Sequence, residues 1–163
     1  MATSSKDLSY YDASKIPSGK GMRIGILVSE WNESITFGLR DGAITALKDC
    51  GVAENDIIVK LVPGSFELPL AAQYLLKRDD IDGVVCLGSV VQGETKHFDF
   101  VCQGTTDGVM NVSLKYNKPA IFGVLTDNTM QQGLDRSGGK HGNKGIECAI
   151  ACIKMIHLKN TLT

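Results

Sequence analysis

Residues 84–91 read VVCLGSVV, an apolar run with charged and polar residues on both sides. A run this short and this apolar predicts a strand that is buried on both faces of a sheet. Three similar runs lie elsewhere in the chain: MRIGILVS at 22–29, NDIIVKLV at 55–62 and AIFGVLT at 120–126. Four such runs predict a sheet of four strands.

Segments with helical spacing of apolar residues separate these runs. We expect helices at 34–50, 66–78 and 98–117, a short helix at 128–136, a Gly-rich turn at 137–145 and a final helix to about residue 159. Strands alternating with helices predict an α/β fold, and right-handed crossovers make the sheet parallel. The expected architecture is a flavodoxin-like three-layer αβα sandwich with a four-stranded parallel sheet. This domain spans 22–163, and the polar residues 1–21 are expected to form an extended or mobile arm.

The composition is that of an ordinary globular domain. Of 163 residues, 43% are hydrophobic and 21% charged, with a net charge of −1. This balance favours neither nucleic acid nor an anionic membrane as a partner. The apolar runs are too short to span a bilayer, and the N-terminus lacks the apolar core of a secretory signal. Five cysteines without paired spacing indicate a reducing compartment, so we expect a cytoplasmic protein.

Five cysteines occur without paired spacing. The simplest interpretation is that they are small buried hydrophobes in a reducing compartment. Cys148 and Cys152 are four residues apart on one helical face, which leaves a metal pair open as an alternative. His141 and His157 lack partners at metal-ligand spacing and are interpreted as structural.

Ligands of such folds bind at the carboxyl ends of the strands, so the residues that follow each strand are the candidates. Trp31 and Asn32 follow the first strand: Trp31 can be core or a stacking platform, and Asn32 a turn residue or helix N-cap. The turn PGSFELP at 63–69 follows the second strand. Its Glu67 favours the positive end of a helix dipole and can also accept hydrogen bonds from a polyol.

The densest polar cluster, QGETKHFDF at 92–100, follows the third strand. His97 begins a helix there, where the dipole favours a neutral imidazole, so both a structural and an acid–base role remain open. Residues 135–145 (DRSGGKHGNKG) combine four glycines with three cations. They fit either a solvated turn or a phosphate site. No stretch matches a P-loop or a dinucleotide-binding fingerprint.

Five stretches taken together resemble the 6,7-dimethyl-8-ribityllumazine synthase family. They lie in the family's order and spacing between about residues 22 and 159: Trp31-Asn32, VPGSFELP at 62–69, GSVVQGETKHFDFV at 88–101, PAIFGVLT at 119–126 and DRSGGKHGNKG at 135–145. The resemblance implies the same fold and an active site between adjacent subunits of a pentamer. It also implies the condensation of 5-amino-6-(D-ribitylamino)uracil with 3,4-dihydroxy-2-butanone 4-phosphate, which releases phosphate and two waters. None of these steps needs a cofactor or a metal.

The resemblance also implies a role for each matching residue. His97 corresponds to the proton donor, and Arg136 supplies a bidentate cation to the phosphate. The implied pyrimidine and ribityl contacts are Trp31, Asn32, Ser65, Phe66, Glu67, Ser89, Val90 and Val91, with Phe122 contributed by the neighbouring subunit. The implied butanone phosphate contacts are Glu94, Thr95, Arg136 and Lys144.

Two residues depart from the family pattern. Gln92 stands where Arg or Lys is frequent, and Glu94 stands where a small residue is common. A carboxylate beside a phosphate is repulsive, so we expect the backbone N–H of Glu94, rather than its side chain, to face the substrate.

The alternative on the same fold is a non-catalytic flavin-binding or shell-forming protein, because Trp31 could stack on an isoalloxazine as well as on a pyrimidine. An electron-transfer flavodoxin is disfavoured because WNES at 31–34 does not suit an FMN phosphate. The segment between Arg136 and Lys144 carries no long insertion, which by resemblance permits a 60-subunit shell. Riboflavin synthase is the candidate protein partner.

Overall fold

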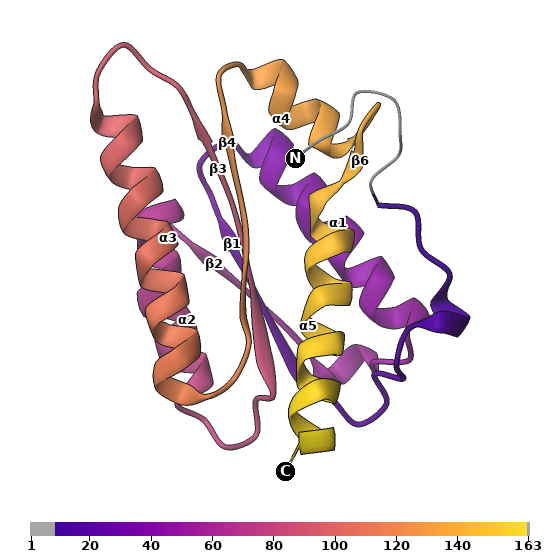
Figure 1. Ribbon diagram of the computed structural model, residues 1–163. Coiled ribbons are helices and arrows are strands. Elements are labelled where there is room, and N and C mark those ends of the chain that lie inside the picture. The colour runs from indigo at the N-terminus through magenta and orange to yellow at the C-terminus, as the bar shows by residue number, and fades with distance from the viewer. Residues whose placement is uncertain (1–8, 163) are drawn as a thin grey trace.

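The computed structural model describes residues 9–162 and contains one sheet of four parallel strands (Figure 1). The strands are β1 (Ile24–Ser29), β2 (Ile57–Val62), β3 (Gly83–Val91) and β4 (Ala120–Asp127), in the order β2-β1-β3-β4. The helices are α1 (Glu33–Asp49), α2 (Leu68–Leu76), α3 (His97–Tyr116), α4 (Met130–Arg136) and α5 (Lys144–Leu162). This order is that of the first four strands of a flavodoxin-like sheet. The predicted α/β fold is confirmed.

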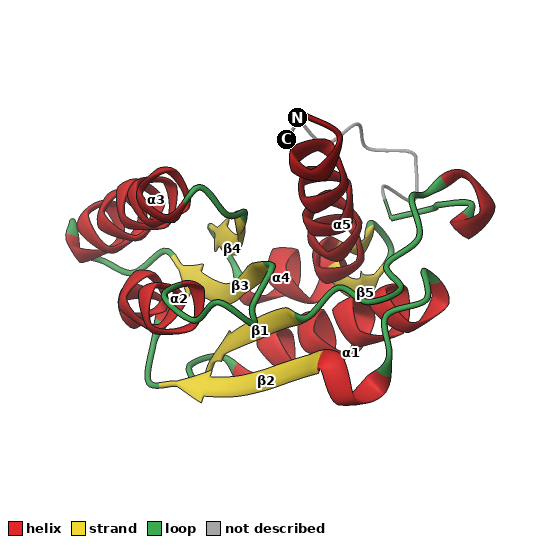
Figure 2. Cartoon of the chain, turned by 90° about the horizontal axis from the view of Figure 1, so that it is seen from below, coloured by secondary structure: helices red, strands yellow, loops and turns green. Residues whose placement is uncertain are grey.

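Helices cover both faces of the sheet, with α2 and α3 on one face and α1, α4 and α5 on the other (Figures 1 and 2). Alternate strand residues supply the two cores, as the period of two requires. On β1, Ile24, Ile26 and Val28 join the core under α1 and α5, whereas Leu27 joins the core under α2 and α3. Burial on both faces explains why the strands read as unbroken apolar runs.

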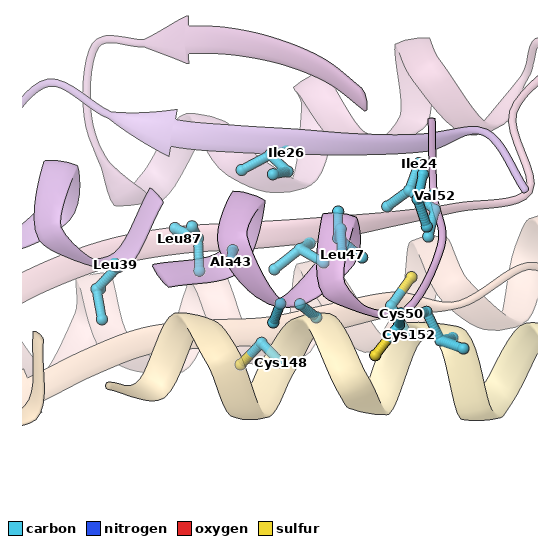
Figure 3. Close-up of a cluster of buried hydrophobic side chains, with 14 of the residues drawn as sticks. Ile24, Ile26, Leu39, Ala43, Leu47, Cys50, Val52, Leu87, Cys148 and Cys152 are labelled. Atoms are coloured by element: carbon cyan, nitrogen blue, oxygen red, sulfur yellow. The ribbon is translucent and has the colours of Figure 1, made fainter. Parts of the chain in front are cut away.

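The core between the sheet, α1 and α5 also holds Cys50, Cys148 and Cys152 (Figure 3). Burial raises the pKa of the Cys148 thiol to about 11 and that of Cys86, on β3, to about 12. Both thiols therefore stay protonated and uncharged near neutral pH, and they pack as small hydrophobic side chains. Within residues 9–162, no group of three or more His, Cys, Asp or Glu side chains could hold a metal ion.

The register of β3 prepares one end of the sheet for binding. Its pairing with β1 ends at Leu87, whereas its pairing with β4 continues to Val91. The last four residues of β3, 88–91, therefore have no partner on β1. Their main-chain groups that face β1 lie at the carboxyl end of the sheet, where ligands of this fold bind.

Two predicted elements differ in detail from the structure. The helix expected over 66–78 begins at Leu68, after a 3-10 turn (η3, Ser65–Glu67), with Pro69 in its first turn, where a missing N–H costs little. The Gly-rich turn expected over 137–145 is a small hairpin, β5 (Ser137–Gly139) and β6 (Gly142–Asn143), and α5 already begins at Lys144. Positive φ angles at Gly138 and Gly142 make this tight reversal possible.

The predicted N-terminal arm is described from residue 9; residues 1–8 lie outside the described part. Between 9 and 21 it contains a single 3-10 turn, η1 (Ala13–Lys15). Tyr11, Ala13 and Ile16 pack against the core under α1 and α5, and the Tyr11 hydroxyl donates to Asp49 at 2.7 Å. None of the described helices is both long and apolar enough to cross a membrane.

Candidate active site

A pocket of about 720 Å³ lies at the carboxyl ends of β1, β2 and β3. Its walls come from the residues that follow each of these strands and from the first turn of α3. The lining residues are Trp31, Asn32, Gly64, Ser65, Phe66, Glu67, Ser89, Val90, Val91, His97, Phe100 and Val101. Nine of the predicted site residues are among them.

The residues after β1 form one wall. The Trp31 side chain is 73% exposed, so it is not part of the core and presents its ring to the pocket. Asn32 has a left-handed backbone (φ 59°, ψ 47°), a conformation that Asn adopts more readily than most residues. It precedes α1 at the N-cap position, but its amide does not cap the helix; Nδ2 donates to the Ser89 carbonyl at 3.1 Å. Asn32 thus ties the end of β1 to the carboxyl end of β3.

The turn between β2 and α2 forms a second wall. A Cβ atom on Gly64 would lie 3.1 Å from Glu67 Oε2 and 3.4 Å from Trp31 Cδ1, so the carboxylate and the indole converge above this glycine. Ser65 is only 6% exposed, and its Oγ atom has no hydrogen-bond partner among the described residues. The Trp31 ring and the Glu67 carboxylate therefore approach each other over the main chain of Gly64, which has no side chain to separate them.

The segment from β3 to α3 closes the pocket. His97 is the first residue of α3 and is exposed, and its main-chain N–H donates to Thr95 Oγ1 at 3.4 Å. Phe100 and Val101, one turn further along, add an apolar surface that was not predicted as part of the site. The available signal was their spacing, because residues three and four positions after His97 share its helix face.

Five predicted residues do not line this pocket. Glu94 and Thr95 lie in the connection from β3 to α3, beside lining residues in the sequence. Phe122 is on β4, an edge strand, and packs against the core under α2 and α3. Arg136 and Lys144 lie at the end of α4 and the start of α5, on the other face of the sheet (Figure 1).

The two cations share one acidic partner. Arg136 Nη2 donates to Glu147 at 2.6 Å, its Nη1 donates to the His141 carbonyl at 2.7 Å, and Lys144 Nζ lies 3.1 Å from the second Glu147 oxygen. Burial raises the pKa of the Asp127 carboxyl at the end of β4, and the charge of Arg136 opposes this shift. The two cations and their acidic partner therefore form a local ion-pair cluster beside the ends of α4 and α5, on the other face of the sheet from the pocket of the same chain.

The pocket has the chemistry of a site for a planar heterocycle with a polar chain. It offers an exposed indole, the backbone of a strand end, a carboxylate and an imidazole at a helix N-terminus. The fold and this pocket define a small-molecule enzyme of the flavodoxin-like α/β class.

Comparisons with known proteins identify the family. A family model for 6,7-dimethyl-8-ribityllumazine synthase matches residues 21–160. The chain is 55% identical over 159 residues to the 6,7-dimethyl-8-ribityllumazine synthase of Flavobacterium johnsoniae, covering 98% of this chain and 84% of that protein. It is 49% identical to the enzyme of the same name from Porphyromonas gingivalis, covering 98% and 99%, and 48% identical to that of Phocaeicola vulgatus, covering 99% and 96%. The chain belongs to the 6,7-dimethyl-8-ribityllumazine synthase family.

Proposed function

We propose that the chain condenses 5-amino-6-(D-ribitylamino)uracil with 3,4-dihydroxy-2-butanone 4-phosphate to form 6,7-dimethyl-8-ribityllumazine, the penultimate step of riboflavin biosynthesis. The amine and ketone lose one water on forming an imine, inorganic phosphate is eliminated, and ring closure releases a second water. The observation that carries the proposal is the convergence of Trp31, Glu67 and His97, which follow three different strands, on one pocket of a chain of this family.

The pyrimidine substrate is assigned to the wall around Trp31. Its ring stacks on the exposed indole, while main-chain groups of Ser89, Val90 and Val91 meet the uracil edge. The ribityl chain lies along Ser65, Phe66 and Glu67, where the carboxylate accepts hydrogen bonds from hydroxyl groups. This arrangement follows the pocket from the end of β3 to the turn after β2.

His97 is assigned the proton transfers. Imine formation, phosphate elimination and ring closure each move a proton near neutral pH, which suits an imidazole. His97 is exposed at the first residue of the 20-residue helix α3 and lines the pocket. Each step is an addition, elimination or dehydration, so electrons are not exchanged with a cofactor.

The phosphate group is assigned to the backbone N–H of Glu94, to Thr95 and to the cations Arg136 and Lys144. Because both cations lie across the sheet from the pocket of their own chain, we assign them, together with Phe122, to the pocket of a neighbouring copy. Arg136 would exchange Glu147 for the phosphate, an anion of higher charge to which it can bind through two N–H groups.

A shared site requires an oligomer, and exposed apolar side chains support one. Large apolar side chains are exposed on three neighbouring elements: Leu61 on β2, Leu70 and Tyr74 on α2, and Phe100, Met110 and Leu114 on α3. Several exposed apolar side chains on adjacent elements are typical of a protein interface. We propose that the chain forms a cytoplasmic homo-pentamer. A 60-subunit shell built from such pentamers is the proposed higher assembly. Riboflavin synthase, which consumes the product, is the proposed partner.

A two-substrate assay tests the function. Lumazine and inorganic phosphate should appear in a one-to-one ratio, only when both substrates are present. Trp31 is the only tryptophan of the sequence, so its emission should change as the pyrimidine substrate alone is added. Flavin binding without turnover would instead favour the non-catalytic alternative.

A further inference from the structure

The turn that carries Ser65, Phe66 and Glu67 is held from behind by α3. Thr105 is fully buried on this helix, and its Oγ1 donates to the main-chain carbonyl of Ser65 at 3.2 Å. The adjacent Thr106 makes the ordinary bond of a helical threonine, from its Oγ1 to the Cys102 carbonyl one turn earlier at 2.7 Å. Of these two neighbours, Thr105 alone uses its hydroxyl to fix a different segment of the chain.

Two glycines of α3 shape the surface that receives this turn. A Cβ atom on Gly104 would lie 2.6 Å from Phe66 Cε2, and one on Gly108 would lie 2.7 Å from Pro69. On its opposite side, the turn packs against β3, where a Cβ atom on Gly88 would overlap Ser65 Oγ. The turn is thus packed between β3 and α3. The Thr105 hydroxyl bonds the main chain of the turn to α3.

We infer that Thr105 is a positioning residue for the pyrimidine substrate. It acts through the Ser65 carbonyl and holds the turn at a fixed height relative to α3. Thr105 and His97 are eight residues apart on α3, or about 12 Å along its axis. The helix therefore links the ribityl-binding turn rigidly to the residue that moves protons. The inference rests on the proposed function, because it assigns the turn to that substrate.

Removing the hydroxyl should weaken one substrate selectively. In Thr105→Val the shape is kept while the Ser65 carbonyl loses its donor. Loss of one such bond should raise the Kd of the pyrimidine substrate, measured by Trp31 emission, roughly three- to tenfold. The KM of the butanone phosphate should stay within twofold because Thr95 is untouched. The pH profile of turnover should keep its shape because His97 is untouched. Thr105→Ser should restore the affinity, and Thr106→Val is the matched control and should leave it unchanged.

The outcomes separate this inference from the proposed function. A wild-type enzyme without turnover would refute the function, whereas a wild-type enzyme that turns over beside an unchanged Thr105→Val would refute only the positioning role. Equal weakening of both substrates, or failure of Thr105→Ser to rescue, would also overturn it. If Thr105→Val does not fold, Gly104→Ala tests the same support by displacing Phe66. It should produce the same selective loss, and unchanged pyrimidine affinity there would contradict the inference.

Discussion

Two ionisable side chains, Glu67 and His97, line the pocket described for this chain. In the proposed mode of binding they face different parts of the substrate, Glu67 the ribityl chain and His97 the reacting end. His97→Ala should reduce kcat by roughly 10²–10⁴-fold, as expected for a lost acid–base group. The Trp31 emission titration should still report pyrimidine binding close to that of the wild type. A variant that turns over within twofold of wild type would assign the protons to another group or to solvent.

Arg136 can serve either of two roles, binding the substrate phosphate or stabilising the fold through its ion pair with Glu147. Arg136→Ala should raise the KM of the butanone phosphate roughly 10–150-fold, the effect of losing a charged hydrogen bond, and leave that of the pyrimidine much less changed. Lys140→Ala is the matched control: Lys140 is exposed in the turn between β5 and β6 and pairs with Asp135 of α4. Equal effects on both substrates would mean that Arg136 serves the fold, through its pair with Glu147.

Asp127 makes stability depend on pH. Its Oδ2 is buried without a hydrogen-bond partner in the described chain, and burial raises its pKa. A raised carboxyl pKa means that the ionised form destabilises the fold, so the cost appears as pH rises above 3.8. Asp127→Asn should therefore raise Tm at pH 7, but only by roughly 1–2 °C, because solvent screens the charge of this partly exposed carboxylate.

The gain from Asp127→Asn should shrink as the pH is lowered toward 4, where the wild-type carboxyl also becomes neutral. Asp79→Asn, at an exposed position, is the control and should change Tm little at either pH. A loss of Tm at pH 7 would show that attraction to Arg136 outweighs the burial of the carboxylate.

The sequence was informative about those site residues that combine unusual chemistry with a strand end. Trp31, Glu67 and His97 each follow a predicted strand, and the topology of a parallel sheet brings such positions together. Phe100 and Val101 could not be predicted in this way. An apolar residue on a helix fits a core, an interface or a pocket equally well, and only the fold decides between them.

The packing of α1 on α5 depends on one glycine. A Cβ atom on Gly145 would overlap the Leu39 carbonyl of α1. Because main chain cannot move aside as a flexible side chain can, Gly145→Ala should destabilise the fold by about 1–3 kcal/mol. The expected loss of Tm is roughly 2–10 °C. Gly93→Ala, where a Cβ meets nothing within 4 Å, should leave Tm nearly unchanged, and an equal loss in both variants would contradict this explanation.

The alternation of strands and helices was predictable because burial on both faces leaves a clear apolar pattern. The hairpin of β5 and β6 was not, since it consists mainly of glycines and polar residues without the β-branched side chains that mark a strand. Its geometry depends on tertiary contacts: the Asn143 amide donates to the Gly38 carbonyl of α1 at 2.8 Å, and its oxygen accepts from Gly145. Contacts over such sequence distances leave no local signal.

In the molecule as a whole, the sheet separates the two halves of the proposed site. The pocket with His97 lies on the side of α2 and α3, and the Arg136 cluster lies on the side of α1, α4 and α5 (Figure 2). This placement on opposite faces favours a site that a second copy of the chain completes. A ring closed by heterologous contacts would place the cations of one copy at the pocket of the next.

Co-assembly of two impaired variants tests this shared site most directly. His97→Ala and Arg136→Ala are mixed in equal amounts, unfolded and refolded together, and assayed at low butanone phosphate. Random assembly joins an intact His97 pocket to an intact Arg136 neighbour at about a quarter of the sites, so about a quarter of wild-type activity should appear. A mixture of wild type with the double variant should retain the same fraction. Single-variant mixtures no more active than their parents, with about half the activity in the wild-type mixture, would contradict the account, because that pattern requires each chain to own a complete site.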